Sequence, residues 1–209
     1  MQRRALLHSL TLALPIGGLG MAGTARAAVA VGTAAPPFSA LDVDGRRVSL
    51  ADFKGRWVML EWVNPGCPYV RKHYSSQNMQ ATQRSAVAKG VAWLAINSTA
   101  TDSTDYLKPA ALGAWMKEQQ AAATATLMDE PGTIGRAYGA RTTPHMYLID
   151  PNGVLQYIGA IDSKPTAKVA DIATATNHVN QALAEALAGK PVSVPSTQAY
   201  GCSIKYPSM

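Results

Sequence analysis

Nearly continuous apolar runs alternate along the chain with more polar segments of helical character. The runs at 57–63 (WVMLEWV) and 91–98 (VAWLAINS) are short and rich in β-branched and aromatic residues, which predicts two buried strands. A shorter run at 125–130 (ATLMDE) predicts a third strand. The segments at 68–90 and 107–120 predict helices, each with a proline near its first turn, where the missing N–H costs nothing. This alternation predicts an α/β fold with a central sheet covered by helices on both faces.

Further elements flank this alternating segment. Asp44 and Gly45 lie between alternating apolar positions and predict a hairpin turn, followed by a short helical turn at 49–55. The pattern after the third strand predicts a short helix at 131–140, two strands around a turn at 151–153, and a long Ala-rich amphipathic helix at 165–188. The last twenty residues carry three prolines and predict an extended tail.

The first 27 residues have the composition of an export signal. A basic start (MQRR) precedes an apolar stretch, and the ARA sequence at 25–27 matches a cleavage site. The paired Arg3 and Arg4 suggest the twin-arginine route; the motif lacks its usual Phe and Lys, so general secretion stays open. An uncleaved anchor is the other alternative, although Pro15 and five glycines between 17 and 32 make a poor membrane helix. We therefore predict cleavage after Ala27, a periplasmic location and no stable membrane insertion after cleavage.

The net charge of the chain does not indicate a nucleic-acid partner. The chain carries a formal net charge of +6, and its first 27 residues hold three arginines and no acidic residue, which leaves 16 basic and 13 acidic residues. The basic residues are scattered, without a stripe of interleaved aromatics. We therefore expect no nucleic-acid partner.

The chain has two cysteines, Cys67 in NPGCPYV and Cys202 in YGCSIKY. An exported protein meets an oxidising compartment, where two cysteines can form one disulfide or act as two functional thiols, and the count alone does not choose. Cys67 lies where a strand gives way to a helix, and the start of a helix stabilises a thiolate. Arg71 and Lys72 would add positive charge if they point toward the sulfur. The alternative is a buried inert cysteine or half of a structural disulfide.

These residues resemble a known family. WVMLEWVNPGCPYVRKHY, AYGARTTPHMYLIDPNGVLQYIG and the tail GCSIKY are similar to the thioredoxin-like superfamily, specifically its redoxin (AhpC/TSA, peroxiredoxin-like) branch, over about residues 32–207. The resemblance implies a thioredoxin-like fold with a central mixed sheet. It implies one redoxin domain at 28–190, between the export signal at 1–27 and an extended tail at 191–209.

The resemblance also assigns candidate roles. Cys67, followed by Pro68, falls on the family's reactive cysteine, and Glu61 falls where thioredoxins carry a buried acid that relays a proton. Thr143 and Pro144 fall on a loop with a cis-proline that faces the cysteine, although Thr-Pro could also be an ordinary turn.

One further candidate and two departures complete the comparison with the family. Arg141 matches an arginine that assists peroxide, or is a surface residue. Val70 replaces the second cysteine of the thioredoxin motif. Asn64 stands where peroxiredoxins carry a threonine.

Cys202 is the natural partner for Cys67. The 14 steps from Ala188 to Cys202 span about 46 Å when extended, and a compact domain of this size is roughly 40 Å across. The tail is therefore long enough to reach. A permanent bond would be structural, whereas a cycling bond would make Cys202 a resolving cysteine that attacks a mixed disulfide or a sulfenic acid on Cys67.

Other polar residues have weaker assignments. Alternation places Glu61 on one strand face with Met59 and Val63, where burial would raise the pKa of its carboxyl and suit it to hold a proton; the alternative is an edge residue that faces water. We expect His73 and His178 on the surface. His145 could approach Cys67, and with Cys202 the three could bind Cu(I), which soft ligands suit; we predict no metal site and no cofactor.

The sequence thus predicts an exported thiol oxidoreductase of the redoxin type, with Cys67 as nucleophile and Cys202 as candidate resolving cysteine. Its substrate is a hydroperoxide or, as the alternative, a disulfide, and an unknown periplasmic thiol reductant would restore it. A different class of function is a copper carrier or a non-catalytic binding module that keeps a structural disulfide.

Overall fold

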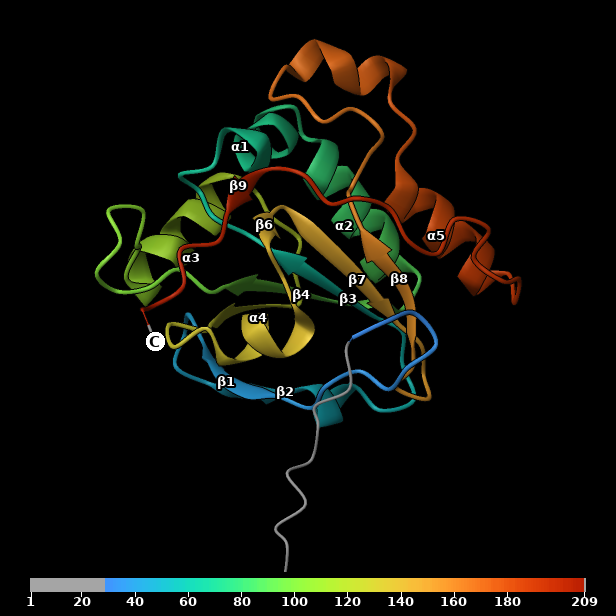
Figure 1. The fold of residues 1–209 in the computed structure, drawn as a ribbon, viewed down its shortest axis with the longest axis horizontal. Coiled ribbons are helices and arrows are strands. Elements are labelled where there is room, and N and C mark those ends of the chain that lie inside the picture. The colour runs from blue at the N-terminus through green and yellow to red at the C-terminus, as the bar shows by residue number, and fades with distance from the viewer. Residues whose placement is uncertain (1–28, 209) are drawn as a thin grey trace, which may run out of the picture.

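Three parallel strands, built from the apolar runs, form the middle of a seven-stranded sheet (Figure 1). The computed structural model describes residues 29–208. The parallel strands are β3 (Val58–Trp62), β4 (Ala92–Asn97) and β5 (Ala125–Met128). Antiparallel strands complete the sheet in the order β2-β1-β5-β4-β3-β7-β8, with β1 at Ser39–Asp42, β2 at Arg47–Ser49, β7 at His145–Ile149 and β8 at Leu155–Gly159. The fold is thioredoxin-like, with the predicted mixed sheet.

Helices cover both faces of the sheet (Figure 1). Alternate residues of β3 enter different cores, since Met59 packs with α1, α2, α3 and α5, whereas Leu60 packs with α4. The helices span Pro68–Ser75 (α1), Asn78–Ala88 (α2), Pro109–Glu118 (α3), Thr133–Tyr138 (α4) and His178–Leu187 (α5). The expected helical turn after the first hairpin is a short 3₁₀ helix at Leu50–Phe53.

Two predicted helices are each divided, which corrects the sequence prediction. The helix expected at 68–90 breaks between α1 and α2, where Gln77 has a left-handed φ of 62° and the Ser76 hydroxyl donates to the Lys72 carbonyl over 2.7 Å. A serine that satisfies the last carbonyls of a turn competes with helix propagation.

The helix expected at 165–188 is a 3₁₀ helix at Val169–Thr174 followed by α5. Asn177 divides the two, because its side-chain oxygen accepts from the Asn180 backbone N–H over 2.9 Å and caps α5.

The tail is extended, as predicted, and crosses back over the end of the sheet near α1 (Figure 1). Its strand β9 (Cys202–Ser203) pairs antiparallel with β6 (Thr142–Thr143), a short strand just before β7. On the two sides of β9, the Thr197 N–H donates to the Ile158 carbonyl over 3.1 Å, and the Ile204 N–H donates to the Arg141 carbonyl over 3.0 Å. The tail is therefore an integral part of the folded domain.

The export signal predicted at 1–27 lies outside the described residues. Between residues 29 and 208, no helix is long and apolar enough to cross a membrane.

Candidate active site

Cys67 lies at the junction between β3 and α1, as the sequence predicts. It is the N-cap residue of α1, Pro68 occupies the first helical position, and the Cys67 side chain is only 2% exposed. The Cys67 N–H donates to the Asn64 carbonyl over 3.0 Å, and the Asn64 side chain in turn accepts from the Gly66 N–H over 2.8 Å. The turn before the helix is thus held by backbone and amide hydrogen bonds, and it presents the sulfur at the positive end of the helix.

The Thr-Pro loop faces this sulfur. The peptide bond between Thr143 and Pro144 is cis, and both residues are buried. The Cys67 thiol donates to the Thr143 carbonyl with 3.1 Å between Sγ and the oxygen. Segments 76 residues apart in the sequence therefore meet at the Cys67 sulfur.

Cys202, in the tail, also lies beside the Thr143–Pro144 loop. It pairs with Thr143 in the β6–β9 register, and both cysteines are free thiols. Burial, followed by a side-chain hydrogen bond with Cys67 and the charge of Cys67, raises the pKa of the Cys202 thiol to about 12. The two thiols are therefore neighbours, and Cys202 keeps its proton at neutral pH.

The cations of α1 do not point at the sulfur. The Arg71 Nε donates to the Pro65 carbonyl over 2.7 Å, and Lys72 is buried against Asp162, with 3.2 Å between Nζ and Oδ2. Val70, one turn into the helix, is completely buried and fills the position of the missing second cysteine. The helix start, the backbone turn, the Thr143 carbonyl and Cys202 are therefore the groups that surround Cys67.

Glu61 is completely buried on the face of β3 that packs against α1 and α2. Its carboxylate accepts from the Trp93 Nε1 over 2.7 Å, the Tyr74 hydroxyl over 2.8 Å and the Gln83 Nε2 over 3.0 Å. Burial raises the pKa of the Glu61 carboxyl, and these three donors oppose that increase. Among residues 29–208, no cation contacts the carboxyl, and burial favours its protonated form.

A second buried carboxyl, Asp162, holds the tail. It forms an ion pair with Lys72 and accepts a short hydrogen bond from the Tyr200 hydroxyl, two residues before Cys202. His73 lies 3.4 Å from the Tyr200 oxygen through Nε2. Sequence reasoning missed this cluster; the only signal was the proximity of Tyr200 to Cys202 in the chain.

The structure corrects the prediction for His73. Its side chain is completely buried rather than on the surface, and burial lowers its pKa to about 4. His178 is half-buried.

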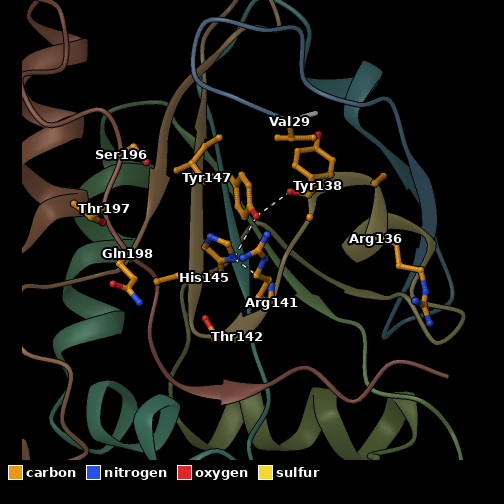
Figure 2. A pocket seen from close by; sticks show the side chains of 14 residues that line it. Val29, Arg136, Tyr138, Arg141, Thr142, His145, Tyr147, Ser196, Thr197 and Gln198 are labelled. Atoms are coloured by element: carbon orange, nitrogen blue, oxygen red, sulfur yellow. Dashed lines mark hydrogen bonds between the residues drawn. The ribbon is translucent and has the colours of Figure 1, made fainter. Parts of the chain in front are cut away.

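Arg141 and His145 line a different space, a cavity of about 650 Å³ between the tail and the turn after α4, here called the α4–tail cavity (Figure 2). The His145 Nδ1 lies 3.2 Å from the Tyr147 hydroxyl and 3.4 Å from the Arg141 backbone nitrogen. Within residues 29–208, the structure records no hydrogen bond from His145 to Cys67 and no cluster of three metal-ligating side chains.

Comparisons with known proteins agree with this geometry. A model described as the AhpC/TSA family matches residues 31–158. The chain is 27% identical over 169 residues to the thiol-disulfide oxidoreductase ResA of Geobacillus thermodenitrificans, covering 75% of this chain and 87% of that protein. It is 27% identical to the thiol:disulfide interchange protein DsbE of Pseudomonas aeruginosa, covering 61% of this chain and 68% of that protein.

Two solved structures share the fold. A crystal structure of an uncharacterized conserved protein from Geobacillus kaustophilus aligns with a TM-score of 0.74 at 27% identity, covering 86% of this chain and 94% of that one. A hypothetical protein from Sinorhizobium meliloti aligns with a TM-score of 0.73 at 24% identity, covering 88% and 98%. The similarity therefore extends over most of the described domain.

Proposed function

Because this chain belongs to the AhpC/TSA family, we propose that it is a periplasmic thiol-disulfide oxidoreductase in which Cys67 is the nucleophile and Cys202 is its partner. The observation that carries the proposal is the β6–β9 pairing, which holds Cys202 beside Cys67 across the cis-proline loop. Cys202 thereby takes the part that a second cysteine one turn into the helix plays in the thioredoxin motif.

The reaction proceeds by two thiolate attacks. The Cys67 thiolate attacks one sulfur of a substrate disulfide, forms a mixed disulfide and releases the other substrate sulfur as a thiolate. Cys202 then loses its proton, attacks the Cys67 sulfur and displaces the remaining substrate thiolate. The two protein thiols lose two electrons and become a disulfide, the substrate becomes two thiols, and the protons of Cys67 and Cys202 end on them. A periplasmic thiol reductant restores the dithiol.

Glu61 serves this cycle as a proton store in the proposal. Its carboxyl is buried on the Cys67 side of β3, and burial raises its pKa. Cys202 needs a base when it attacks, because its own pKa is high. A carboxyl without a paired cation can accept that proton at little electrostatic cost.

Disulfide exchange is favoured over peroxide reduction because both curated relatives compared above are named for disulfide chemistry. In addition, the peroxiredoxin threonine is replaced by Asn64, whose side chain is engaged in the turn before Cys67. Thr143 and Pro144 serve the exchange by placing the two thiols, since Thr143 pairs with Cys202 and its carbonyl accepts from the Cys67 thiol. Arg141 has no place in this cycle, since it lines the α4–tail cavity.

Trapping the mixed disulfide tests the proposal. Reduced Cys202→Ser protein is mixed with an oxidised peptide, and in parallel with hydrogen peroxide, and intact-protein mass spectrometry follows Cys67. We expect a stable Cys67–peptide adduct in this variant and a Cys67–Cys202 bond in the native protein. Rapid sulfenic acid formation without an adduct would instead select the peroxidase. Cell fractionation of the full-length chain tests the periplasmic location.

A further inference from the structure

We propose that the α4–tail cavity binds a small organic carboxylate with an apolar or aromatic body. This site lies beyond the proposed disulfide chemistry and does not depend on it. Its volume, about 650 Å³, falls in the range of small-molecule pockets.

The charge of the lining favours an anion. The 14 lining residues include two arginines and a histidine but no aspartate or glutamate. Arg136 is already engaged, because its Nη2 donates to the Pro207 carbonyl over 2.6 Å and its guanidinium lies 4.7 Å from the centre of the Tyr206 ring. Figure 2 shows Arg136 turned away from Arg141 and His145. Arg141 is therefore the cation available to a ligand.

Arg141 and His145 each offer the cavity a nitrogen without a hydrogen-bond partner among the described residues. Between residues 29 and 208, the structure records neither a hydrogen bond nor an ion pair for the Arg141 guanidinium. Its charge does reach the imidazole, since burial and then Arg141 lower the pKa of His145 to about 4. The His145 Nδ1 is engaged by the Tyr147 hydroxyl and the Arg141 backbone nitrogen, and the structure records no hydrogen bond for Nε2 among residues 29–208. The Arg141 guanidinium and the imidazole ring thus line one cavity (Figure 2).

The remaining lining selects the body of the ligand. Val29, Ile158 and Ala199 supply accessible apolar surface of the wall, and Tyr147 and Tyr138, which are 1% and 2% exposed, pack edge to face behind it with 5.5 Å between ring centroids. Ser196 to Ala199 of the tail close the opposite side. A planar carboxylate matches the fork of a guanidinium, and an apolar body suits the apolar part of the wall. Inorganic anions would use only the first of these features.

Calorimetric titration tests the site, with benzoate, phenylacetate and hexanoate as carboxylate probes and benzamide as the neutral analogue. We expect at least one carboxylate to bind at a single site and benzamide to bind at least tenfold more weakly. Arg141→Gln should lower the affinity about tenfold to a hundredfold, the usual effect of losing a charge-assisted hydrogen bond. Arg84→Gln, an exposed arginine on α2, should leave it unchanged. NMR should show the His145 ring signal shift with benzoate.

The proposal is overturned if none of the three carboxylates binds the native protein, or if Arg141→Gln binds as tightly as the native protein. Equal binding of benzamide would also overturn it, and so would phosphate binding as tight as that of the carboxylates. Arg141 is exposed and its guanidinium makes no internal bond among the described residues, so an unchanged melting temperature for Arg141→Gln separates a binding defect from misfolding.

Discussion

The two buried carboxyls on either side of α1 are stabilised in opposite ways. Glu61 is surrounded by neutral donors, including Tyr74 of α1, whereas Asp162 is paired with the cation of Lys72 on the same helix. A buried charge without a counter-ion is costly, so burial favours the protonated form of Glu61, whereas Asp162 and Lys72 form an ion pair in which the two charges offset each other. The helix carrying Cys67 therefore contacts a carboxyl whose pKa is raised by burial and also a clamp for the tail, formed by the Asp162–Lys72 ion pair and the hydrogen bond from Tyr200 to Asp162.

The largest effect is expected for Asp162→Asn, which breaks the clamp. Lys72 is completely buried and would lose its counter-ion, so we expect a loss of about 3–5 kcal/mol in the free energy of unfolding. Urea unfolding measures the loss. Asp44→Asn is the control, because its ion pair with Arg46 is exposed and should contribute under about 1 kcal/mol. Equal losses in the two variants would contradict the clamp.

His73 makes the clamp side of α1 sensitive to acid. Burial and the charge of Lys72 lower its pKa, against the attraction of Asp162, from an ordinary 6.5 to about 4. A depressed pKa contributes stability that is present above the unfolded value and is lost as pH falls through the folded value. The native protein should therefore lose about 2–3 kcal/mol between pH 6.5 and 4 through His73. Unfolding curves across this range should be flatter for His73→Gln, and parallel curves would refute the assignment.

Glu61→Gln tests the other carboxyl. The stability that Glu61 contributes should decrease as pH rises, whereas the stability that His73 contributes decreases as pH falls. Three donors converge on the carboxylate, and an amide offers only one acceptor, so we expect a loss of about 2 kcal/mol. Because the folded pKa of Glu61 is raised, its contribution is complete below pH 4.5 and is lost as pH rises through the folded value. The cost of the substitution should therefore shrink as pH rises. The rate of thiol exchange should also lose part of its pH dependence, and an unchanged profile would exclude Glu61 from proton transfer.

The buried position of Glu61 can be predicted from the sequence, whereas that of Asp162 cannot. Glu61 is predictable because it interrupts an apolar run of seven residues, and a polar residue in such a strand is either buried with partners or exposed at an edge. Cys67 and the Thr143–Pro144 loop follow from local motifs. The strands follow from the same runs, since each buried strand is a local pattern.

The burial of Asp162 cannot be predicted from the sequence, because it depends on residues far away in the chain. It stands in a polar loop sequence, and its partners lie 90 residues before it and 38 residues after it. Lys72 and His73 look like the solvent face of a helix until the tail covers them. The break at Gln77 likewise depends on the hydrogen bond from the Ser76 hydroxyl to the Lys72 carbonyl. The spacing of apolar residues in the sequence does not indicate this hydrogen bond.

The smallest change in stability is expected for Tyr200→Phe, which separates the tail from the clamp without disturbing Lys72. The substitution removes the hydrogen bond to Asp162, together with the 3.4 Å contact between the hydroxyl and the His73 Nε2, and should cost about 1 kcal/mol. It retains the edge-to-face packing on Tyr69, at 5.8 Å between centroids. Since Tyr200 precedes Cys202 by two residues, the loosened tail should form the Cys67–Cys202 bond severalfold more slowly.

Stopped-flow oxidation measures that rate, and Tyr138→Phe is the matched control, because its hydroxyl donates to the Pro36 carbonyl in the other core. Tyr138→Phe should lose similar stability and keep the native oxidation rate. If both variants oxidise equally slowly, the rate follows global stability rather than the position of the tail. If neither is slowed, the β6–β9 pairing alone places Cys202, and the Asp162 clamp serves only to bury Lys72.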